Sequence, residues 1–267
     1  MTNQFTAISW NCRRAKADSQ VWDYLLELNP DIALLQEVVT IPPKVLDQFA
    51  SYQQRPAFNS GALQKFSTAI LVRGQVGNPI DLSGLAPWVD VELERFPGNL
   101  ICRELILEKG LTIKSISVYN PAYGIDLKQL EGVDISGVRL KQNSGLWIED
   151  ILWASLKFHQ LSPMDSWIIA GDFNMSETFD HPHPRGNREY LDRMAGIGLT
   201  ECLRKSKGAL TPTFRNPRGG AVVHQMDHLF VTESLASRLI SCDTGSQKRV
   251  FDGGLSDHLP LIAHFLV

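Results

Sequence analysis

Short runs of apolar, often β-branched residues recur along the whole chain and constrain its fold more than any other feature. Eight of them are typical of strands, at residues 5–10, 31–36, 67–73, 100–107, 111–119, 167–170, 226–232 and 259–265. Several are apolar at nearly every position, which is typical of strands covered on both faces. Such strands need packing partners on both sides.

Helical patterns lie between some of these runs. Residues 18–28 begin with Asp18 as a candidate N-cap, and residues 144–159 carry a long amphipathic pattern. No repeat or linker divides the chain, and its longest irregular stretches are 74–98, 120–143 and 180–220. We therefore expect an α/β fold, with two packed sheets and helices outside them, in one domain spanning residues 1–267.

Composition narrows the class of protein. The 267 residues are 43% hydrophobic and 21% charged, as in ordinary globular enzymes. Four well-separated cysteines, without a CxxC pair, exclude a small disulfide scaffold and a cysteine-rich zinc site. No secretory signal pattern or membrane-length apolar run is visible, so we expect a cytoplasmic protein with no membrane partner.

Polar residues follow several of the expected strands, where sites form in α/β folds. Asn11 ends the first strand and Glu37 the second. Each residue also has an ordinary structural explanation: Asn11 could be a turn residue, and Glu37 could be a surface charge where the chain emerges from the strand. Together, a carboxylate and an amide oxygen also suit a hard cation such as Mg²⁺.

The C-terminal half supplies further candidates. In the segment WIIAGDFN, Gly171 is expected to permit a sharp turn from which Asp172 and Asn174 project. Asp227 opens a later strand, and Asp257 and His258 lie in the segment LSDHLPL. Taken alone, GDFN is moderately specific and SDH is weak evidence. The chance that all of these motifs agree in order along nearly the whole chain is small.

In that order the sequence resembles the endonuclease/exonuclease/phosphatase family, which includes exonuclease III, AP endonucleases and DNase I. The resemblance is carried by SWN, PDIALLQE, VYNP, IIAGDFN, MDHLFV and LSDHLPL, which together extend from residue 9 to residue 261. It implies a DNase I-like four-layer α-β-β-α sandwich of two packed mixed sheets, with a divalent-metal site at one end.

The resemblance also implies roles for individual residues. Glu37 matches the principal metal ligand, with Asn11 close by and Asp257 as a second acidic contact. Asp172 matches the residue that orients or deprotonates the attacking water. The remaining matches are Asn174 as the amide that holds water and phosphate, His258 as the residue that faces the phosphate, Asp227 as the carboxylate behind that histidine, and Tyr119 as a hydroxyl that contacts phosphate.

The segment Tyr119-Asn120-Pro121 resembles the AP-endonuclease-like branch, because other branches usually carry histidine at the first position. Three departures from that branch stand out: Cys12-Arg13-Arg14 follows Asn11, Val38-Val39 follows Glu37, and His224 replaces a tryptophan of the abasic-site pocket. The resemblance therefore supports the metal centre and places the abasic-site pocket in doubt.

The net charge of −3 means that any nucleic-acid contact must come from a local patch. Residues 181–220 carry eight Lys or Arg against three Asp or Glu, and Arg13 and Arg14 lie beside Asn11. These charges could form an ordinary solvated face or follow a phosphate backbone. The candidate substrate contacts are Arg13, Arg14, Arg185, Arg188, Arg215, Arg218 and His224.

The favoured hypothesis is a Mg²⁺-dependent nuclease acting on DNA or RNA, with Mn²⁺ as a possible substitute. A metal and a protonated imidazole stabilise the charge of phosphodiester cleavage, and a carboxylate accepts the proton of water. The alternatives are a phosphodiesterase or phosphatase for a small or lipid phosphate on the same centre, and a catalytically silent binding module.

Overall fold

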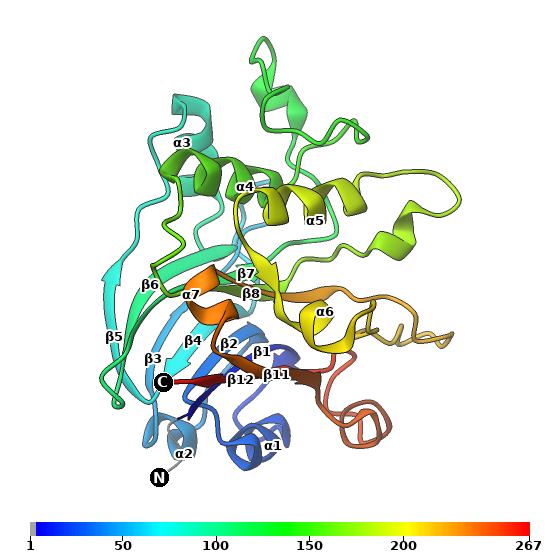
Figure 1. The fold of residues 1–267 in the computed structure, drawn as a ribbon. Coiled ribbons are helices and arrows are strands. Elements are labelled where there is room, and N and C mark those ends of the chain that lie inside the picture. Colours follow the sequence, from blue (N-terminus) through cyan, green and yellow to red (C-terminus); the bar gives the residue numbers. More distant parts are fainter. Residues whose placement is uncertain (1–3) are drawn as a thin grey trace.

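The computed structural model describes residues 4–267. Two six-stranded sheets pack face to face, with helices on both outer faces (Figure 1). Each sheet is mixed, because one parallel pair, β1 with β2 and β7 with β8, lies among antiparallel pairs. The DNase I-like α-β-β-α sandwich expected from the sequence is confirmed.

The first sheet has the order β11-β12-β1-β2-β4-β3. Its strands are β1 (Gln4–Ala15), β2 (Ile32–Val38), β3 (Ala50–Gln54), β4 (Ser67–Val72), β11 (Leu239–Thr244) and β12 (Leu261–Leu266). The second sheet has the order β5-β6-β7-β8-β10-β9. Its strands are β5 (Gly74–Pro79), β6 (Leu100–Leu107), β7 (Thr112–Tyr119), β8 (Trp167–Asp172), β9 (Thr200–Glu201) and β10 (Asp227–Val231).

The helices cover the outer faces and one edge (Figure 1). The first sheet is covered by α1 (Val21–Leu28) and α2 (Pro43–Leu46), and the second by α3 (Pro87–Arg95), α4 (Ile148–His159) and α5 (Asn187–Gly196). Two further helices, α6 (Cys202–Lys207) and α7 (Glu233–Ala236), lie near β10. None of the helices within residues 4–267 has the length and apolar character that a bilayer crossing requires.

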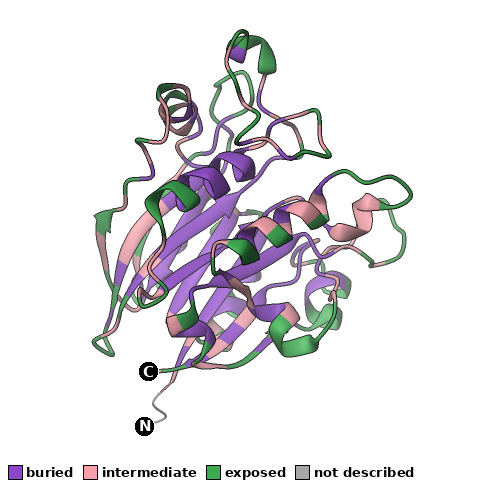
Figure 2. Cartoon of the chain, turned by 45° about the horizontal axis from the view of Figure 1, so that its top comes forward, coloured by how far each residue is buried: buried purple, intermediate pink, exposed green. Residues whose placement is uncertain are grey.

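Three hydrophobic clusters fill the spaces between the four layers. One lies between the sheets and joins Ile32 and Leu34 of β2 to Ile168 and Ala170 of β8. The alternate residues of the same strands face outward into the other two clusters, which the helices cover. Figure 2 shows the resulting continuous burial of the central strands. Because both faces of the central strands are buried, these strands are apolar at nearly every position, as the sequence predicted.

The sequence prediction was wrong at some boundaries. Asp18 does not cap α1, which begins at Val21 after Gln20, without a side-chain cap. The stretch 74–98 contains β5 and α3, and 180–220 contains α5, β9 and α6. These elements are short or polar, so tertiary packing rather than a hydrophobic period defines them.

Candidate active site

Two irregular strands position Asn11 and Glu37. The register between the parallel strands β1 and β2 shifts between Asn11 and Ala15, and that between β2 and β4 shifts between Leu35 and Val38. Glu37 has φ 54°, and Arg13 and Arg14 have φ 47° and 58°. Non-glycine residues rarely adopt this left-handed backbone, and such strain commonly occurs at functional sites. The bulges redirect these side chains at one end of the sheet.

Asp172 occupies the centre of a row that crosses three strands of the second sheet. Tyr119 of β7 and Asp227 of β10 are its direct neighbours in the strand register. Gly171 lies within β8, and a Cβ there would be 1.9 Å from the carbonyl oxygen of Val118. The expectation that Gly171 permits a turn was therefore wrong. This glycine allows close approach to β7, and the chain turns at Asn174, which has φ 49°.

Hydrogen bonds hold the Asp172 carboxylate from two sides. Asn11 donates from Nδ2 to Oδ2 over 2.9 Å, and the backbone N–H of Asn174 donates to Oδ1 over 2.9 Å. The Asn174 amide in turn donates to the carbonyl oxygen of Asn120 over 2.8 Å. Asn120 also donates to the Phe173 carbonyl, so it fixes the turn after β8. Asn120 was not among the site residues predicted from the sequence.

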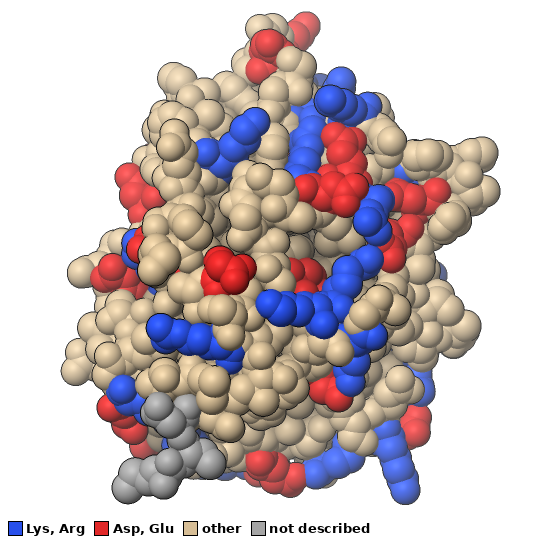
Figure 3. Space-filling view, in the orientation of Figure 1, with Lys and Arg blue, Asp and Glu red and all other residues tan. Residues whose placement is uncertain are grey.

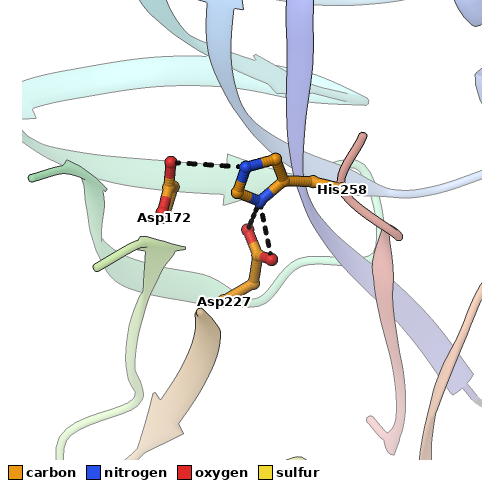
Figure 4. A group of neighbouring side chains, drawn as sticks. All are labelled: Asp172, Asp227 and His258. Atoms are coloured by element: carbon orange, nitrogen blue, oxygen red, sulfur yellow. Dashed lines mark hydrogen bonds and ion pairs between the residues drawn. The ribbon is translucent and has the colours of Figure 1, made fainter. Parts of the chain in front are cut away.

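His258 lies between the carboxylates of Asp227 and Asp172 (Figure 4). Its Nδ1 is 2.9 and 3.1 Å from the two oxygens of Asp227, and its Nε2 is 3.9 Å from Oδ2 of Asp172. The pairing of Asp227 with His258, implied only by resemblance, is therefore present in the structure. It leaves Nε2 as the ring atom directed toward Asp172.

Burial and charge act in opposite directions on this group. Burial alone would lower the pKa of His258, but the Asp227 and Asp172 carboxylates outweigh it and raise the pKa to about 10. Burial raises the pKa of Asp172 to about 7, with a further contribution from Asp227, while His258 and Asn11 oppose the rise. A protonated imidazole next to a carboxylate of near-neutral pKa can hold an anion and accept a proton.

Groups outside the predicted set hold His258 in place. Thr213 Oγ1 accepts hydrogen bonds from the backbone N–H groups of Met226 and Asp227, at 3.0 and 3.2 Å. Ser256 Oγ donates to the carbonyl oxygen of Asn11 over 2.7 Å and accepts from the N–H of His258. The ring of Phe214 lies 4.9 Å from the ring of His258. Thr213 and Ser256 position catalytic candidates through backbone hydrogen bonds, and Phe214 does so through a ring contact. Ser256 lies in the segment LSDHLPL, whereas Thr213 and Phe214 lie outside every motif found in the sequence.

Glu37 and Asp257 place two further carboxylates at the mouth of the site. The side chains of Glu37 and Asp257 are 21% and 20% exposed, and each lies 3.9 Å from an arginine, Arg14 and Arg13 respectively. Burial raises the pKa of Glu37, although the Asn11 amide and the charges of His258 and Arg14 oppose this rise. Contacts of 3.9 Å are longer than hydrogen bonds, so both carboxylates keep acceptor capacity for a cation.

Tyr119 is buried at the end of β7, with its ring edge-on to Phe66 at 5.2 Å. Burial, followed by the charges of Glu37 and Asp172, raises the pKa of its hydroxyl. The phenol is therefore neutral over the physiological range, and it can donate a hydrogen bond.

The structure separates the candidate substrate contacts into paired and open groups. Arg188 forms ion pairs with Glu177 and Asp192, and Arg215 pairs with Asp252. Of the eight cationic residues in 181–220, five are paired with acidic residues: Arg188, Arg193, Arg204, Lys207 and Arg215. Within the described part of the chain, no ion pair involves Arg185 or Arg218. Figure 3 shows acidic and basic side chains interspersed on one face of the molecule.

His224 lies beside the site and is already bonded. Its Nδ1 is 2.7 Å from the hydroxyl of Thr178, and its ring centroid is 4.4 Å from that of Phe179. Burial lowers the pKa of this imidazole, so it is largely neutral at pH 7. Its role in substrate binding stays a prediction.

The sequence pattern of the Endonuclease/Exonuclease/phosphatase family matches residues 8–258, from the first central strand to the histidine of the site. The chain belongs to this family. No curated protein matches the chain in sequence.

Solved structures of the family have the same fold. An AP endonuclease from Archaeoglobus fulgidus superposes with a TM-score of 0.70 and 18% identity, covering 98% of this chain and 100% of that chain. A 3′ phosphatase, NExo, from Neisseria, bound to a product DNA hairpin, gives 0.65 and 18%, covering 98% and 99%. The endonuclease domain of the retrotransposon TRAS1 gives 0.59 and 15%, covering 98% of each chain. At these identities the likeness establishes the fold, and the chemistry depends on the site.

Proposed function

We propose that this family member is a divalent-metal-dependent nuclease that hydrolyses phosphodiester bonds of DNA or RNA. The observation that carries the proposal is the position of Asp172, which is fixed by Asn11 and Asn174 and faces His258 with Asp227 behind it. A catalytically silent module would have no need of these buried, mutually oriented polar groups, since each costs free energy to desolvate.

Mg²⁺ is the proposed cation, with Mn²⁺ as a substitute. The donors that fit it are the half-buried carboxylates of Glu37 and Asp257, and the second lone pair of the Asn11 amide oxygen, which accepts from the Arg13 N–H. When bound, such a cation supplies charge stabilisation to the phosphate oxygens and the leaving group.

A second acidic group could also hold a cation. Asp172, Asp227 and His258 offer ligand atoms within 4.8 Å of one another. We assign this group to proton and phosphate handling instead. The Nδ1 of His258 already bonds both oxygens of Asp227, and a raised histidine pKa disfavours the neutral ring that metal ligation requires.

Each side chain of the site has a separate role in the proposed hydrolysis. Asp172 orients the attacking water and accepts its proton, and Asn174 holds water and phosphate beside it. His258, protonated and fixed by Asp227, donates from Nε2 to a phosphate oxygen. Tyr119 donates its hydroxyl to the phosphate from the opposite side of the row. Arg13, Arg14, Arg185 and Arg218 are the proposed contacts to neighbouring phosphates, with Arg188, Arg215 and His224 as weaker candidates because they are already paired or bonded.

We also propose that residues 1–267 act as one unit, since strands of both sheets contribute to the site. Four free cysteines, three of them buried, agree with a reducing compartment such as the cytoplasm.

The test is an activity screen with Mg²⁺ and Mn²⁺ over single- and double-stranded DNA, abasic duplex, RNA and small phosphodiesters. We expect cleavage of nucleic acid that an Asp172→Asn variant lacks. Because His224 replaces an apolar wall of the abasic pocket, we expect no strong preference for abasic duplex. A hundredfold preference, about 2.7 kcal/mol, would restore an AP-endonuclease assignment. Turnover of small phosphodiesters alone would overturn the nuclease assignment.

A further inference from the structure

A pocket of about 330 Å³ adjoins the candidate site on the side of α4 and α5. Asn120 and Asn174, which carry the turn beside Asp172, form part of its wall, and so does Met226, the residue before Asp227. The two helices lie on the outer face of the second sheet (Figure 1). The pocket therefore opens next to the place where the cleaved phosphate would bind. Its volume is in the range of small-molecule sites.

The wall of this pocket contains a flat aromatic side chain in a fixed position. The indole of Trp147 lies against Gly145 and Gly124, where an added Cβ would approach indole atoms to 2.4 and 3.5 Å. Gly145 thus leaves room for the ring, and Gly124 lies within ordinary contact distance of it. Phe179 contributes a second aromatic ring to the lining. Planar side chains of this kind bind planar ligands by stacking.

Polar atoms without partners lie among the lining residues. Among residues 4–267, no hydrogen bond reaches Tyr190 Oη, Glu149 Oε2 or Asn120 Oδ1, although each atom is buried. Tyr190 and Glu149 are 1% and 6% exposed and line the pocket. A buried polar atom without a partner costs free energy, and in native proteins such atoms usually have a ligand, water or functional role.

The charge of the lining restricts the ligand. The lining includes one buried carboxyl, that of Glu149, and its one cation is the exposed Arg185, so no buried cation among the lining residues would hold an anion. Burial, followed by the neighbouring Asp150, raises the pKa of Glu149, so that its carboxyl can be neutral and can donate as well as accept. The lining therefore suits a neutral, flat ligand with hydrogen-bonding edges that is attached to a phosphate outside.

We propose that this pocket binds one unpaired nucleobase of the nucleotide next to the cleaved phosphodiester, with Trp147 stacking on it and Tyr190 bonding its edge. A base within a duplex is stacked and paired, so it would reach the pocket only after extrusion. The proposal rests on the proposed nuclease function and refines its substrate to single strands, ends or flipped nucleotides.

The experiment compares one single-stranded oligonucleotide with a matched strand in which tetrahydrofuran residues replace the nucleotides that flank the cleaved bond. The wild-type protein should cleave the base-bearing strand at least tenfold more efficiently, measured as kcat/KM. Tyr190→Phe and Trp147→Ala should lose most of this ratio, because their losses fall mainly on the base-bearing strand. Phe158→Ala, at an exposed position on the far part of α4, should keep the wild-type ratio.

Tyr190→Phe is the sharpest variant, because it removes only a hydroxyl that has no partner within residues 4–267. Its Tm should equal or exceed that of the wild type, so a lost ratio would not reflect misfolding. Equal cleavage of both strands by the wild type, or an undiminished ratio in Tyr190→Phe, would overturn the nucleobase pocket and leave the nuclease function standing. Cleavage of neither strand with Mg²⁺ or Mn²⁺ would overturn the pocket assignment. It would overturn the nuclease function as well if duplex DNA and RNA also resist cleavage in the activity screen.

Discussion

Burial would leave an isolated imidazole uncharged at neutral pH, yet His258 lies against two carboxylates that reverse this preference. If Asp227 and His258 act as a unit, Asp227→Asn and His258→Ala should each reduce kcat/KM by two to four orders of magnitude, roughly 3–5 kcal/mol. The double variant should lose little more than the worse single one. Additive losses in this double-mutant cycle would show that the residues act independently.

The pH dependence of the same pair gives a separate check. If the protonated imidazole is the active form, as proposed, activity should persist at alkaline pH and decline as pH rises through about 10, the raised pKa of His258. In Asp227→Asn the ring loses the carboxylate that favours its proton. The alkaline limb of the pH–rate profile should therefore move to lower pH, and an unmoved limb would contradict the assignment.

Glu37 should matter for metal affinity more than for folding. Its strained backbone and half-buried carboxylate are set by the bulge at the end of β2, so Glu37→Gln should preserve the fold. We expect calorimetry to show Mg²⁺ or Mn²⁺ affinity reduced at least tenfold, and activity reduced in parallel. Glu131→Gln, an exposed position, serves as the control. Unchanged metal affinity in Glu37→Gln would remove Glu37 from the metal site.

Some site residues could be read from the sequence and others could not. Asp172, Asp227 and His258 lie in the ordered motifs, and the structure brings their side chains together. Thr213 and Ser256 act by bonding the backbone that carries those side chains. Ser256 lies within the motif LSDHLPL, but the motif does not reveal its role, and Thr213 lies outside every motif. A hydroxyl that bonds the backbone has no characteristic partner in the sequence, because every residue carries the same backbone atoms.

At the scale of elements, the central strands could be predicted because both of their faces are buried. In β2, Ala33 and Leu35 face the helices while Ile32 and Leu34 face the other sheet. The edge strand β5 has the sequence GQVGNP and is largely exposed, so it shows no such pattern. Strands of this kind are defined by pairing with a neighbour, here β6, which the sequence of one segment does not reveal.

Gly171 joins the packing of the second sheet to the position of Asp172. An alanine Cβ would meet the Val118 carbonyl at 1.9 Å, and that atom belongs to the backbone of the neighbouring strand. We expect Gly171→Ala to lower the free energy of unfolding by about 2–4 kcal/mol in urea denaturation, and to reduce activity in the remaining folded protein. Gly196→Ala, at the end of α5 with no atom within 4 Å of the added Cβ, is the matched control. Equal stabilities of the two variants would contradict the close contact.

At the scale of the whole molecule, charge placement differs from what composition alone indicates. The stretch 181–220 is basic in sequence, but most of its cationic residues pair with acidic residues, and some of these, such as Glu177, Asp243 and Asp252, lie outside the stretch. A count of charges along the sequence could not reveal these ion pairs, because the fold brings the partners together from distant segments. Of the cations without such pairs, Arg185 lines the pocket beside Asn174, whereas Lys205 bonds the Ala236 carbonyl at α7. We propose that Arg185 and Arg218, together with Arg13 and Arg14, form a small footprint for phosphates rather than an extended basic surface.

The salt dependence of nucleic-acid binding should reflect this small footprint. If about four arginines contact phosphates, the logarithm of the binding constant should fall against the logarithm of salt concentration with a slope near −3.6 for duplex DNA. The measurement is fluorescence anisotropy on a His258→Ala background without added divalent metal, in which cleavage is too slow to affect binding. Arg14→Ala should make the slope shallower by about one unit, because its side chain is 71% exposed and makes only long contacts, 3.9 Å to Glu37 and 5.8 Å to the Phe66 ring centroid. Arg188→Ala should leave the slope unchanged, because Glu177 and Asp192 already neutralise that guanidinium. A slope steeper than about −7, or equal effects of the two substitutions, would show that the paired arginines release their partners to bind nucleic acid.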